Sequence, residues 1–471
     1  MLTYSLEERG DMPLYEYLYQ KMKEDILAGK LTAGEKLPSK RSLARHLQVG
    51  VITVENAYAQ LAMEGYIYSL EKRGYFVSQL LLDQVPGPDR RGELSLNTEE
   101  EKMPMCDEGM LDLAGNRILP ENFPFSVWSK LMRRVLLEQD TKLLEPMPNQ
   151  GVYPLRKAIA AHLQAFRGME VAPGQIVVGA GTEYLYTLLI QLLGRRHVYG
   201  VENPGYPKTA QIYRSNEVEC RFLPLDQEGL SMEALRQSDA NVIHISPGHH
   251  FPTGIVMPVK RRQELLAWAA QDEMRYVIED DYDSEFRFQG RLIPTLQSID
   301  RKEKVIYMNT FSKTMAPSIR ISYMVLPPRL VRRYQETLAM YSCTVPSFEQ
   351  YTLARFLEKG YFEQHINRMR TFYRNQRNQV IRTIRESALA SKVKILEEDA
   401  GLHFLLEVDT RLSDEELVGR LRQCQVLVKS LKDYTFGQED CKEHMLVVNY
   451  SGVRQEQLQK SIALLEKVLD L

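Results

Sequence analysis

Two segments that end in chemically active side chains most strongly constrain how this chain folds. Residues 275–282 read Arg-Tyr-Val-Ile-Glu-Asp-Asp-Tyr, and residues 305–313 read Val-Ile-Tyr-Met-Asn-Thr-Phe-Ser-Lys. Each predicts a strand that runs into polar residues. Alternate residues of a strand share a face, so Asp280 and Tyr282 are expected on the same side. Open α/β sheets bind ligands at this carboxyl end of their strands.

The rest of the chain divides into zones with different patterns. Its 471 residues suggest two or three domains. We expect a first domain over 1–78, a linker over 79–110 that is rich in turn-forming and charged residues, and a last domain over 111–471. In the last zone, short apolar runs alternate with amphipathic helices, which predicts an α/β fold.

Composition excludes several classes of protein. Hydrophobic residues make up 44% and charged residues 26%, with a formal net charge of −2, which is typical of a globular protein and gives no sign of a nucleic-acid coat. The N-terminus does not resemble a signal peptide, and no stretch approaches the ~18 apolar residues of a membrane span. The five cysteines lack paired spacing, so neither disulfides nor a metal site is expected, and the cytoplasm is the expected compartment.

Residues 13–78 predict three helices followed by a hairpin. Leu14, Leu18, Met22 and Ile26 recur at four-residue spacing, as on one face of a helix. Ser39 suits the N-cap of a second, short helix. A third helix is expected over about 52–64, and two strands over 66–69 and 75–78. This order is that of a winged helix-turn-helix.

The same zone resembles the GntR family of bacterial regulators. The resemblance is carried by Pro13-Leu-Tyr-Glu-Tyr-Leu, Gly34-Glu-Lys-Leu-Pro-Ser-Lys-Arg-Ser-Leu-Ala and Thr53-Val-Glu-Asn-Ala-Tyr. It implies that the second helix, the third helix and the wing contact a double-stranded DNA operator. The residues implied are Ser39, Lys40, Arg41, Thr53, Lys72, Arg73 and Gly74.

The third helix departs from the family pattern. Members usually carry a polar residue and an arginine at its start and another arginine one turn later, where this chain has Gly50-Val51 and Glu55-Asn56. Arginine reads guanine edges with two hydrogen bonds, so few or weak direct base contacts are expected. A winged helix that docks only on protein is the alternative.

The two strand-ending segments also carry what a pyridoxal cofactor needs. That cofactor requires an amine to form a Schiff base, an anion for its ring nitrogen, a hydroxyl for its ring oxygen and a cup for its phosphate. Lys313, Asp280 and Tyr282 match the first three, and the pKa of Lys313 is expected to fall beside a cationic ring and an arginine. The cup is expected from Thr310, Ser312 and Arg320, together with Gly181 and Thr182 at a helix start.

These strings resemble the fold-type-I pyridoxal-phosphate enzymes, and most closely the aminotransferase-like domain of MocR-type regulators, a GntR subfamily. Further matching segments begin at Pro148, Glu202, Ser246 and Ala400. The resemblance implies a large mixed-sheet domain with a small C-terminal α+β subdomain from about residue 335, and a homodimer. It implies Lys313 as the cofactor lysine and Tyr206 near the ring or ligand. His249 and His250 fall where the enzymes carry an Asn-Pro-Thr-Gly signature whose asparagine contacts the ring oxygen, so His249 is a candidate cofactor-binding residue, with a loop histidine of no role as the alternative.

The binding group for an effector is less clear. Aminotransferases commonly hold the substrate carboxylate with an arginine in the last strand region, where this chain reads Met445-Leu-Val-Val-Asn-Tyr-Ser-Gly. Lys208, Lys429 and Lys432 are the candidates in its place, although lysine offers a point charge rather than a planar fork.

The leading hypothesis is a DNA-binding transcriptional regulator that senses pyridoxal phosphate, or an amine or amino-acid-like effector, through its aminotransferase-like domain. No catalytic residue is assigned under this hypothesis. The alternatives are a genuine aminotransferase with a DNA-binding appendage, and a cofactor-free repressor whose second domain only dimerises.

Overall fold

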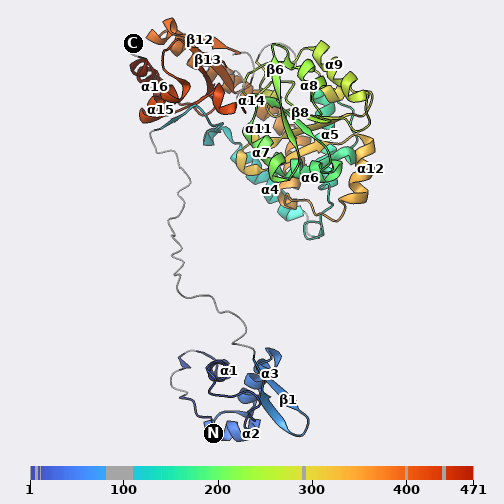
Figure 1. The fold of residues 1–471 in the computed structure, drawn as a ribbon, viewed down its shortest axis with the longest axis vertical. Coiled ribbons are helices and arrows are strands. Elements are labelled where there is room, and N and C mark those ends of the chain that lie inside the picture. The colour runs from blue at the N-terminus through green and yellow to red at the C-terminus, as the bar shows by residue number, and fades with distance from the viewer. Residues whose placement is uncertain are drawn as a thin grey trace. The chain divides into compact units, whose positions relative to one another are not determined.

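A computed structural model describes residues 2–5, 9–10, 12–80, 110–138, 141–288, 293–397, 401–437 and 442–469. The chain forms two compact units, Met1–Met103 and Pro104–Leu471, which are described separately (Figure 1). The predicted linker over 79–110 lies almost entirely outside the described residues. Among the described helices, none combines the length and apolar character that crossing a membrane requires.

The first unit has the order of elements that the sequence predicts. Leu18 and Met22 pack with Val54 and Leu61 in one core, and the two strands pair antiparallel. The predicted winged helix-turn-helix is therefore confirmed. Its elements are α1 (Leu14–Leu27), α2 (Lys40–Leu47), α3 (Val51–Met63), β1 (Ile67–Leu70) and β2 (Gly74–Val77).

Element boundaries in this unit differ slightly from the predicted ones. The Ser39 hydroxyl accepts a hydrogen bond from the backbone N–H of Ser42, so α2 begins directly after this cap. The backbone N–H of Arg73 donates to the carbonyl of Leu70, which closes a tight turn in the wing. Each strand therefore lies one residue closer to this turn than predicted.

The second unit is built on an eight-stranded mixed sheet in the order β4-β11-β10-β9-β8-β5-β6-β7. Neighbours from β10 through β6 are parallel, whereas β11 runs antiparallel to both β4 and β10, and β7 to β6. The strands are β4 (Ile176–Gly179), β5 (Tyr199–Asn203), β6 (Cys220–Asp226), β7 (Gly229–Leu230), β8 (Val242–Ile245), β9 (Tyr276–Asp280), β10 (Val305–Thr310) and β11 (Ser322–Val325).

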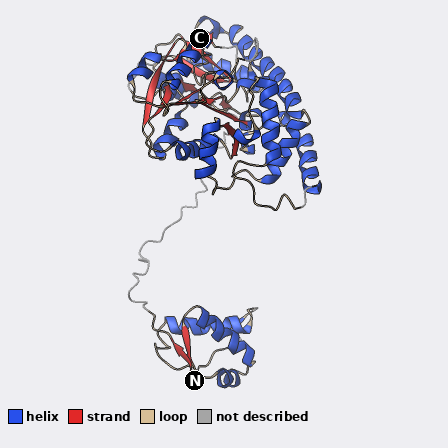
Figure 2. Ribbon diagram, turned by 90° about the vertical axis from the view of Figure 1, so that its right-hand side faces the viewer, coloured by secondary structure: helices blue, strands red, loops and turns tan. Residues whose placement is uncertain are grey.

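Helices cover both faces of this sheet, and Figure 2 shows the strands enclosed by them. Because strand residues alternate between faces, Ile278 and Met308 pack under α6, α7 and α12, whereas Val277 packs with α8 and α9, and Tyr307 with α5 and α13. The helices are α4 (Phe125–Glu138), α5 (Tyr153–Arg167), α6 (Thr182–Leu193), α7 (Pro207–Ser215), α8 (Met232–Gln237), α9 (Val259–Ala270), α10 (Leu296–Ile299), α11 (Phe311–Thr314), α12 (Pro328–Thr337) and α13 (Ser347–Glu358).

A smaller sheet lies at one end of the second unit, beside α15 and α16 (Figure 1). The long helix α14 (Tyr361–Arg385) joins the two parts, because Ile366 packs in a large-sheet core and Ile384 in the small-sheet core. The small part contains β12 (Val393–Leu396), β13 (His403–Val408), β15 (Lys429–Ser430), β16 (Met445–Asn449), α15 (Asp414–Gln423), α16 (Gln455–Val468) and the parallel pair β3 (Leu111–Asp112) and β14 (Val426–Leu427).

The mixed large sheet and the small α+β part confirm the predicted fold class. The boundary near residue 335 stays a prediction, because α13 still packs beside α4 and α5 and the small sheet begins only at Val393. What positions the site is the shared edge at which β5, β8, β9 and β10 end, since parallel strands place their following loops side by side.

Candidate functional site

A cavity of about 360 Å³ opens at this edge, within the size range of small-molecule sites. The loops after β4, β5, β8, β9 and β10 contribute to its wall. It brings together predicted residues that are separated by up to 139 positions in the chain. Those lining it are Gly181, Thr182, Tyr206, Lys208, Asp280, Tyr282, Thr310, Ser312, Lys313 and Arg320.

Lys313 lies in α11, the single turn that follows β10. Burial lowers the pKa of its amine, and the neighbouring Asp283 and Asp280 act in the opposite direction. The direction is the one expected from the sequence, but its main cause is desolvation rather than a cationic neighbour. A neutral amine is the nucleophilic form, so this environment favours attack on an aldehyde.

Asp280 ends β9 and presents a carboxylate that is only half satisfied. The Tyr186 hydroxyl donates to Oδ2 at 2.8 Å, and His244 Nε2 lies 3.5 Å from the same oxygen. Oδ1 is buried and has no hydrogen-bond partner within the described residues. A buried acceptor without a partner is costly, so this oxygen suits a ligand that donates an N–H.

The start of α6 forms a cradle beside Arg320. Gly181 is the N-cap with φ 91°, and an added Cβ there would lie 2.3 Å from Arg320 Nη2. Arg320 Nη2 donates to Glu183 Oε2 at 2.6 Å. The buried hydroxyl of Ser312 has no partner among the described residues. A helix N-terminus, a guanidinium and a free hydroxyl together suit an anion.

Thr310 lines the cavity, but its hydroxyl is already engaged. It accepts from the backbone N–H of Ser312 at 3.1 Å and from the Ser322 hydroxyl at 2.7 Å. The first bond caps α11. The structure therefore gives Thr310 a part in fixing the turn that carries Lys313.

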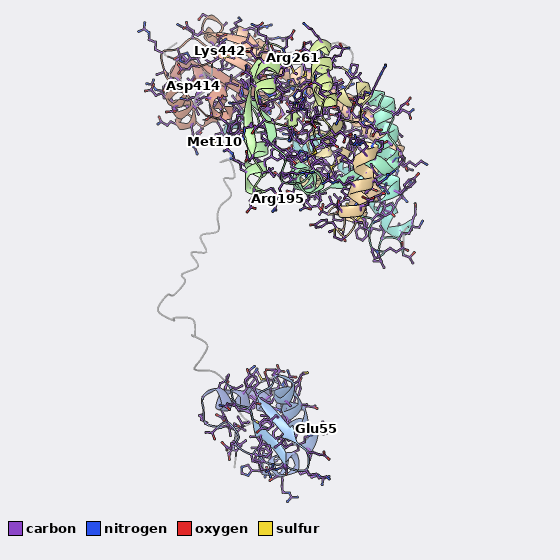
Figure 3. All side chains as sticks on the ribbon, turned by 45° about the vertical axis from the view of Figure 1, so that its right-hand side comes forward. Glu55, Met110, Arg195, Arg261, Asp414 and Lys442 are labelled. Atoms are coloured by element: carbon purple, nitrogen blue, oxygen red, sulfur yellow. The ribbon has the colours of Figure 1, made fainter. Side chains whose placement is uncertain are left out.

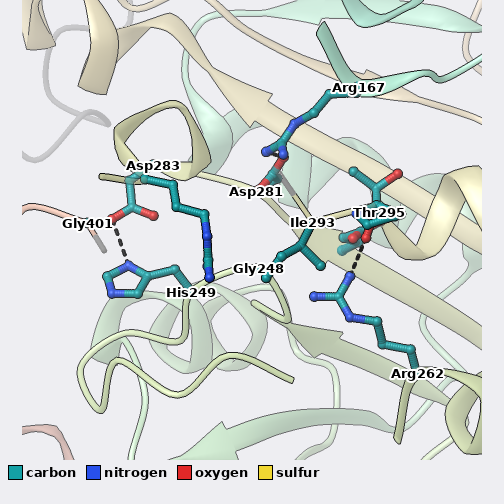
Figure 4. A pocket seen from close by; sticks show the side chains of 12 residues that line it. Arg167, Gly248, His249, Arg262, Asp281, Asp283, Ile293, Thr295 and Gly401 are labelled. Atoms are coloured by element: carbon teal, nitrogen blue, oxygen red, sulfur yellow. Dashed lines mark hydrogen bonds and ion pairs between the residues drawn. The ribbon is translucent and has the colours of Figure 1, made fainter. Parts of the chain in front are cut away.

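His249 does not line the large cavity. Its Nδ1 lies 2.9 Å from Asp283 Oδ2 (Figure 4). The same atom lies 3.3 Å from the Tyr282 hydroxyl, so His249 contacts Tyr282 rather than the cavity itself. There it borders a second cavity of about 20 Å³, which has room for about one water molecule. The neighbouring His250 lines the large cavity instead. Phe251 precedes Pro-Thr-Gly and so stands at the asparagine position of the enzyme signature.

Several lining residues were not predicted from the sequence. Tyr186 and His244 support Asp280 from α6 and β8, and no local string connects them to it. Asn116 has both amide atoms buried without partners in the described residues. Glu202, at the end of β5, accepts from the backbone N–H of Ser246 at 2.9 Å, and burial raises its pKa to about 8. The segment that begins at Glu202 predicts a role for Tyr206 but none for Glu202 itself.

Of the three lysines that are candidates for effector binding, only Lys208 lines the cavity. Its Nζ lies 3.6 Å from Glu183 Oε1. Lys429 lies over the Tyr434 ring, with Nζ 5.5 Å from its centroid, and Lys432 Nζ lies 3.4 Å from Glu415 Oε1. Neither of these two reaches the lining of the cavity.

The residues present fit pyridoxal phosphate. The unpartnered Asp280 oxygen suits a protonated ring nitrogen, and the Gly181 cradle with Arg320 and the Ser312 hydroxyl suits a phosphate. Burial raises the pKa of Tyr282 well above its usual range, so its hydroxyl remains a donor for a ring oxygen. Lys313 supplies the amine in the same cavity.

The predicted DNA-contacting residues lie on three elements of the first unit. Ser39 caps α2, Arg41 is exposed beside it, and Thr53 lies in the first turn of α3. Lys40 is already engaged within this unit rather than available for DNA, because its Nζ lies 2.7 Å from Glu55 Oε1 and 5.4 Å from the Tyr75 ring centroid. The exposed wing turn carries the remaining three, Lys72, Arg73 and Gly74.

Two family models match the chain. Residues 108–464 match aminotransferase class I and II, and residues 14–77 match bacterial regulatory proteins, gntR family. Among solved structures, Pyrococcus horikoshii kynurenine aminotransferase has a TM-score of 0.69 at 23% identity, covering 82% of this chain and 96% of that one. At this identity the likeness shows the fold.

The chain is also similar over most of its length to curated regulators. It is 37% identical to "Uncharacterized HTH-type transcriptional regulator YdeL" of Bacillus subtilis, covering 90% of both chains. It is 33% identical to "Probable rhizopine catabolism regulatory protein MocR" of Rhizobium meliloti, covering 88% of this chain and 85% of that one. It is 30% identical to the HTH-type pyridoxine biosynthesis transcriptional regulator PdxR of Corynebacterium glutamicum, covering 83% of both.

Proposed function

This chain belongs to the helix-turn-helix transcriptional regulators that join a gntR-type domain to an aminotransferase-like domain, and from that premise we propose that it binds pyridoxal 5'-phosphate at Lys313 and an operator through its first unit. The observation that carries the cofactor proposal is one cavity that holds the buried amine of Lys313 and the unpartnered oxygen of Asp280. The proposal includes a cytoplasmic location, because that is where a bacterial operator is found.

The chain's own residues would hold the cofactor in four places. Asp280 would keep the ring nitrogen protonated, with Tyr186 and His244 fixing its carboxylate. Tyr282 would donate to the ring oxygen. Arg320, Ser312 and the start of α6 would bind the phosphate. When bound, the cofactor supplies an aldehyde that reacts with amines and a ring that withdraws electrons.

An amine effector would enter the same cavity and compete with Lys313 for that aldehyde. Lys208 is the remaining cationic candidate for an effector carboxylate, since Lys429 and Lys432 lie outside the lining. The signal would pass as a population shift between arrangements of the protein that differ in DNA affinity. Such a shift needs differential binding of the effector to the two arrangements.

A homodimer is part of this proposal. Four large apolar side chains in and near α4 are strongly exposed, with Phe125 at 64%, Leu136 at 55%, Leu137 at 77% and Leu144 at 83%. Exposed apolar side chains in this number favour a protein interface over free solvent. A second copy of the chain is the partner that the family resemblance implies.

A genuine aminotransferase is not favoured, because the long matches at 30% identity or more are to transcriptional regulators. The segment over 445–452 also lacks an arginine for a substrate carboxylate. Partial reactions with an amine remain compatible with a sensing role.

Capture of sheared genomic DNA from the source organism tests the proposal. The full chain, with and without pyridoxal phosphate, should enrich a small set of fragments, and the cofactor should change that enrichment. Lys313→Ala should still enrich the fragments but lose the cofactor dependence, because the winged helix is intact. A wild-type chain that enriches no fragment in either state would refute the operator part of the proposal.

A further inference from the structure

The outer face of α3 is exposed and carries two large apolar side chains that do not pack in the core of this unit. Val54, Ala57, Tyr58 and Leu61 form the buried face. Ile52, Asn56, Ala59 and Met63 are exposed and follow one another at helical spacing on the opposite side. Ile52 is 72% exposed and Met63 is 77% exposed.

We infer that the N-terminal half of this face, Ile52 and Asn56, reads adenine–thymine pairs in the major groove, with Ile52 against the 5-methyl group of thymine and Asn56 hydrogen-bonded to adenine. The inference rests on the proposed function, since it names the bases that the operator presents to α3. Apolar side chains contact the thymine methyl, and an asparagine amide pairs with N6 and N7 of adenine. Both residues are in the N-terminal half of α3, the half of a recognition helix that reaches base edges.

The residues of α3 itself do not suit guanine, the base that is most often read by a direct side-chain contact. α3 contains no lysine or arginine, so it has no bidentate partner for O6 and N7 of guanine. The α2 cation that contacts α3, Lys40, has its Nζ 2.7 Å from Glu55 Oε1. That ion pair also engages Glu55, whose free carboxylate would otherwise suit the amino group of cytosine; Glu55 lies at the surface of this unit (Figure 3).

The exposed cations on the neighbouring elements suit contacts to the phosphates of the DNA backbone. Arg41 lies at the start of α2, and Lys72 and Arg73 lie in the wing. Contacts to phosphates fix the register of a protein on the duplex, whereas base contacts carry the sequence information. In this inference α2 and the wing bind the DNA phosphates, whereas Ile52 and Asn56 contact the bases.

The experiment compares thymine with uracil, which differs only by the absent 5-methyl group. The full chain first selects duplexes from a random library, and fluorescence anisotropy then measures their affinity with each conserved thymine replaced by uracil. One contacted thymine should weaken binding about fourfold on replacement, the worth of one buried carbon. Ile52→Ala should weaken binding to the thymine duplex by at least as much and should have no further effect on the uracil duplex.

Two further variants sharpen the result. Asn56→Ala should lower the preference for adenine at one position at least about fivefold. Met63→Ala is the matched control, because it removes an exposed apolar side chain from the last turn of the same face, away from the bases. It should leave affinity unchanged.

Three outcomes would overturn the inference. Selected duplexes that bind equally well with uracil at every position, or selected sites without conserved adenine–thymine pairs, refute the readout while leaving DNA binding intact. No selected duplex at all refutes DNA binding itself and the readout with it, and would assign the exposed face to a protein partner.

Discussion

The two glycines that flank α6 form a natural pair of perturbations. Gly181 is the N-cap, with φ 91° and ψ 160°, and Gly194 is the C-cap, with φ 98° and ψ 149°. These angles are close to a region that only glycine adopts readily, and a side chain forced there costs about 1–3 kcal/mol. Gly181→Ala and Gly194→Ala should therefore lower the free energy of unfolding by similar amounts.

The two variants differ in what the new methyl group meets. At Gly181 it would lie 2.3 Å from Arg320 Nη2, whereas at Gly194 the nearest atom is 4.0 Å away. The guanidinium of Arg320 is the end of a flexible side chain, so it would move out of the cradle. A charge-assisted hydrogen bond contributes about 1.5–3 kcal/mol, so the affinity for pyridoxal phosphate should fall about tenfold to a hundredfold.

Absorbance titration with pyridoxal phosphate and urea unfolding measure the two effects on the same samples. The expected result is equal loss of stability in both variants and loss of cofactor affinity in Gly181→Ala alone. Equal cofactor affinity in the two variants would refute the assignment of this cradle to the phosphate.

Three other perturbations test the site. Tyr186→Phe should lower the free energy of unfolding, measured by urea unfolding, by about 1.5–3 kcal/mol, because it removes a donor to a carboxylate. The control Tyr199→Phe removes a buried hydroxyl that has no partner in the described residues, so it should not lower that free energy. Burial raises the pKa of Glu202 from 4.5 to about 8, so the cofactor-free folded chain retains a proton that the unfolded chain releases. Its stability should fall as pH rises through this window, and Glu202→Gln should flatten that dependence in urea unfolding. Lys208→Ala should weaken the spectral response to amino acids, whereas Lys432→Ala should leave it unchanged.

The part of the site that the sequence predicted lies in strings where position along a strand determines direction. Asp280 ends β9, and Lys313 follows β10, so the parallel pairing of these strands brings their ends together. The cradle at Gly181 was predictable for the same reason, because a strand runs directly into a helix there.

The rest depends on contacts between distant elements. Tyr186 lies 94 positions from Asp280, and only the packing of α6 on the sheet makes them neighbours. His249 and His250 are adjacent in a loop, where strand alternation gives no rule for which side chain enters the cavity. The hydroxyl of Thr310 could either bind a phosphate or cap the following helix, and the sequence does not decide between them. In the structure it caps α11.

For α3, the prediction rested on a residue type that is missing from the sequence, namely arginine. The absence of arginine predicted weak base contacts, and the structure adds that Lys40 is engaged by Glu55. The structure also shows that Ile52 and Asn56 share an exposed face, opposite the buried Val54 and Leu61.

Reduction of the pyridoxal-phosphate-loaded protein with borohydride, followed by peptide mass spectrometry, tests the central claim most directly. Reduction makes the link between the amine and the cofactor permanent, so the modified lysine can be identified. The account predicts one modified peptide, carrying the cofactor on Lys313, and none at that position in Lys313→Ala. An unmodified Lys313 in the loaded wild-type protein, or a cofactor found mainly on another lysine, would contradict it.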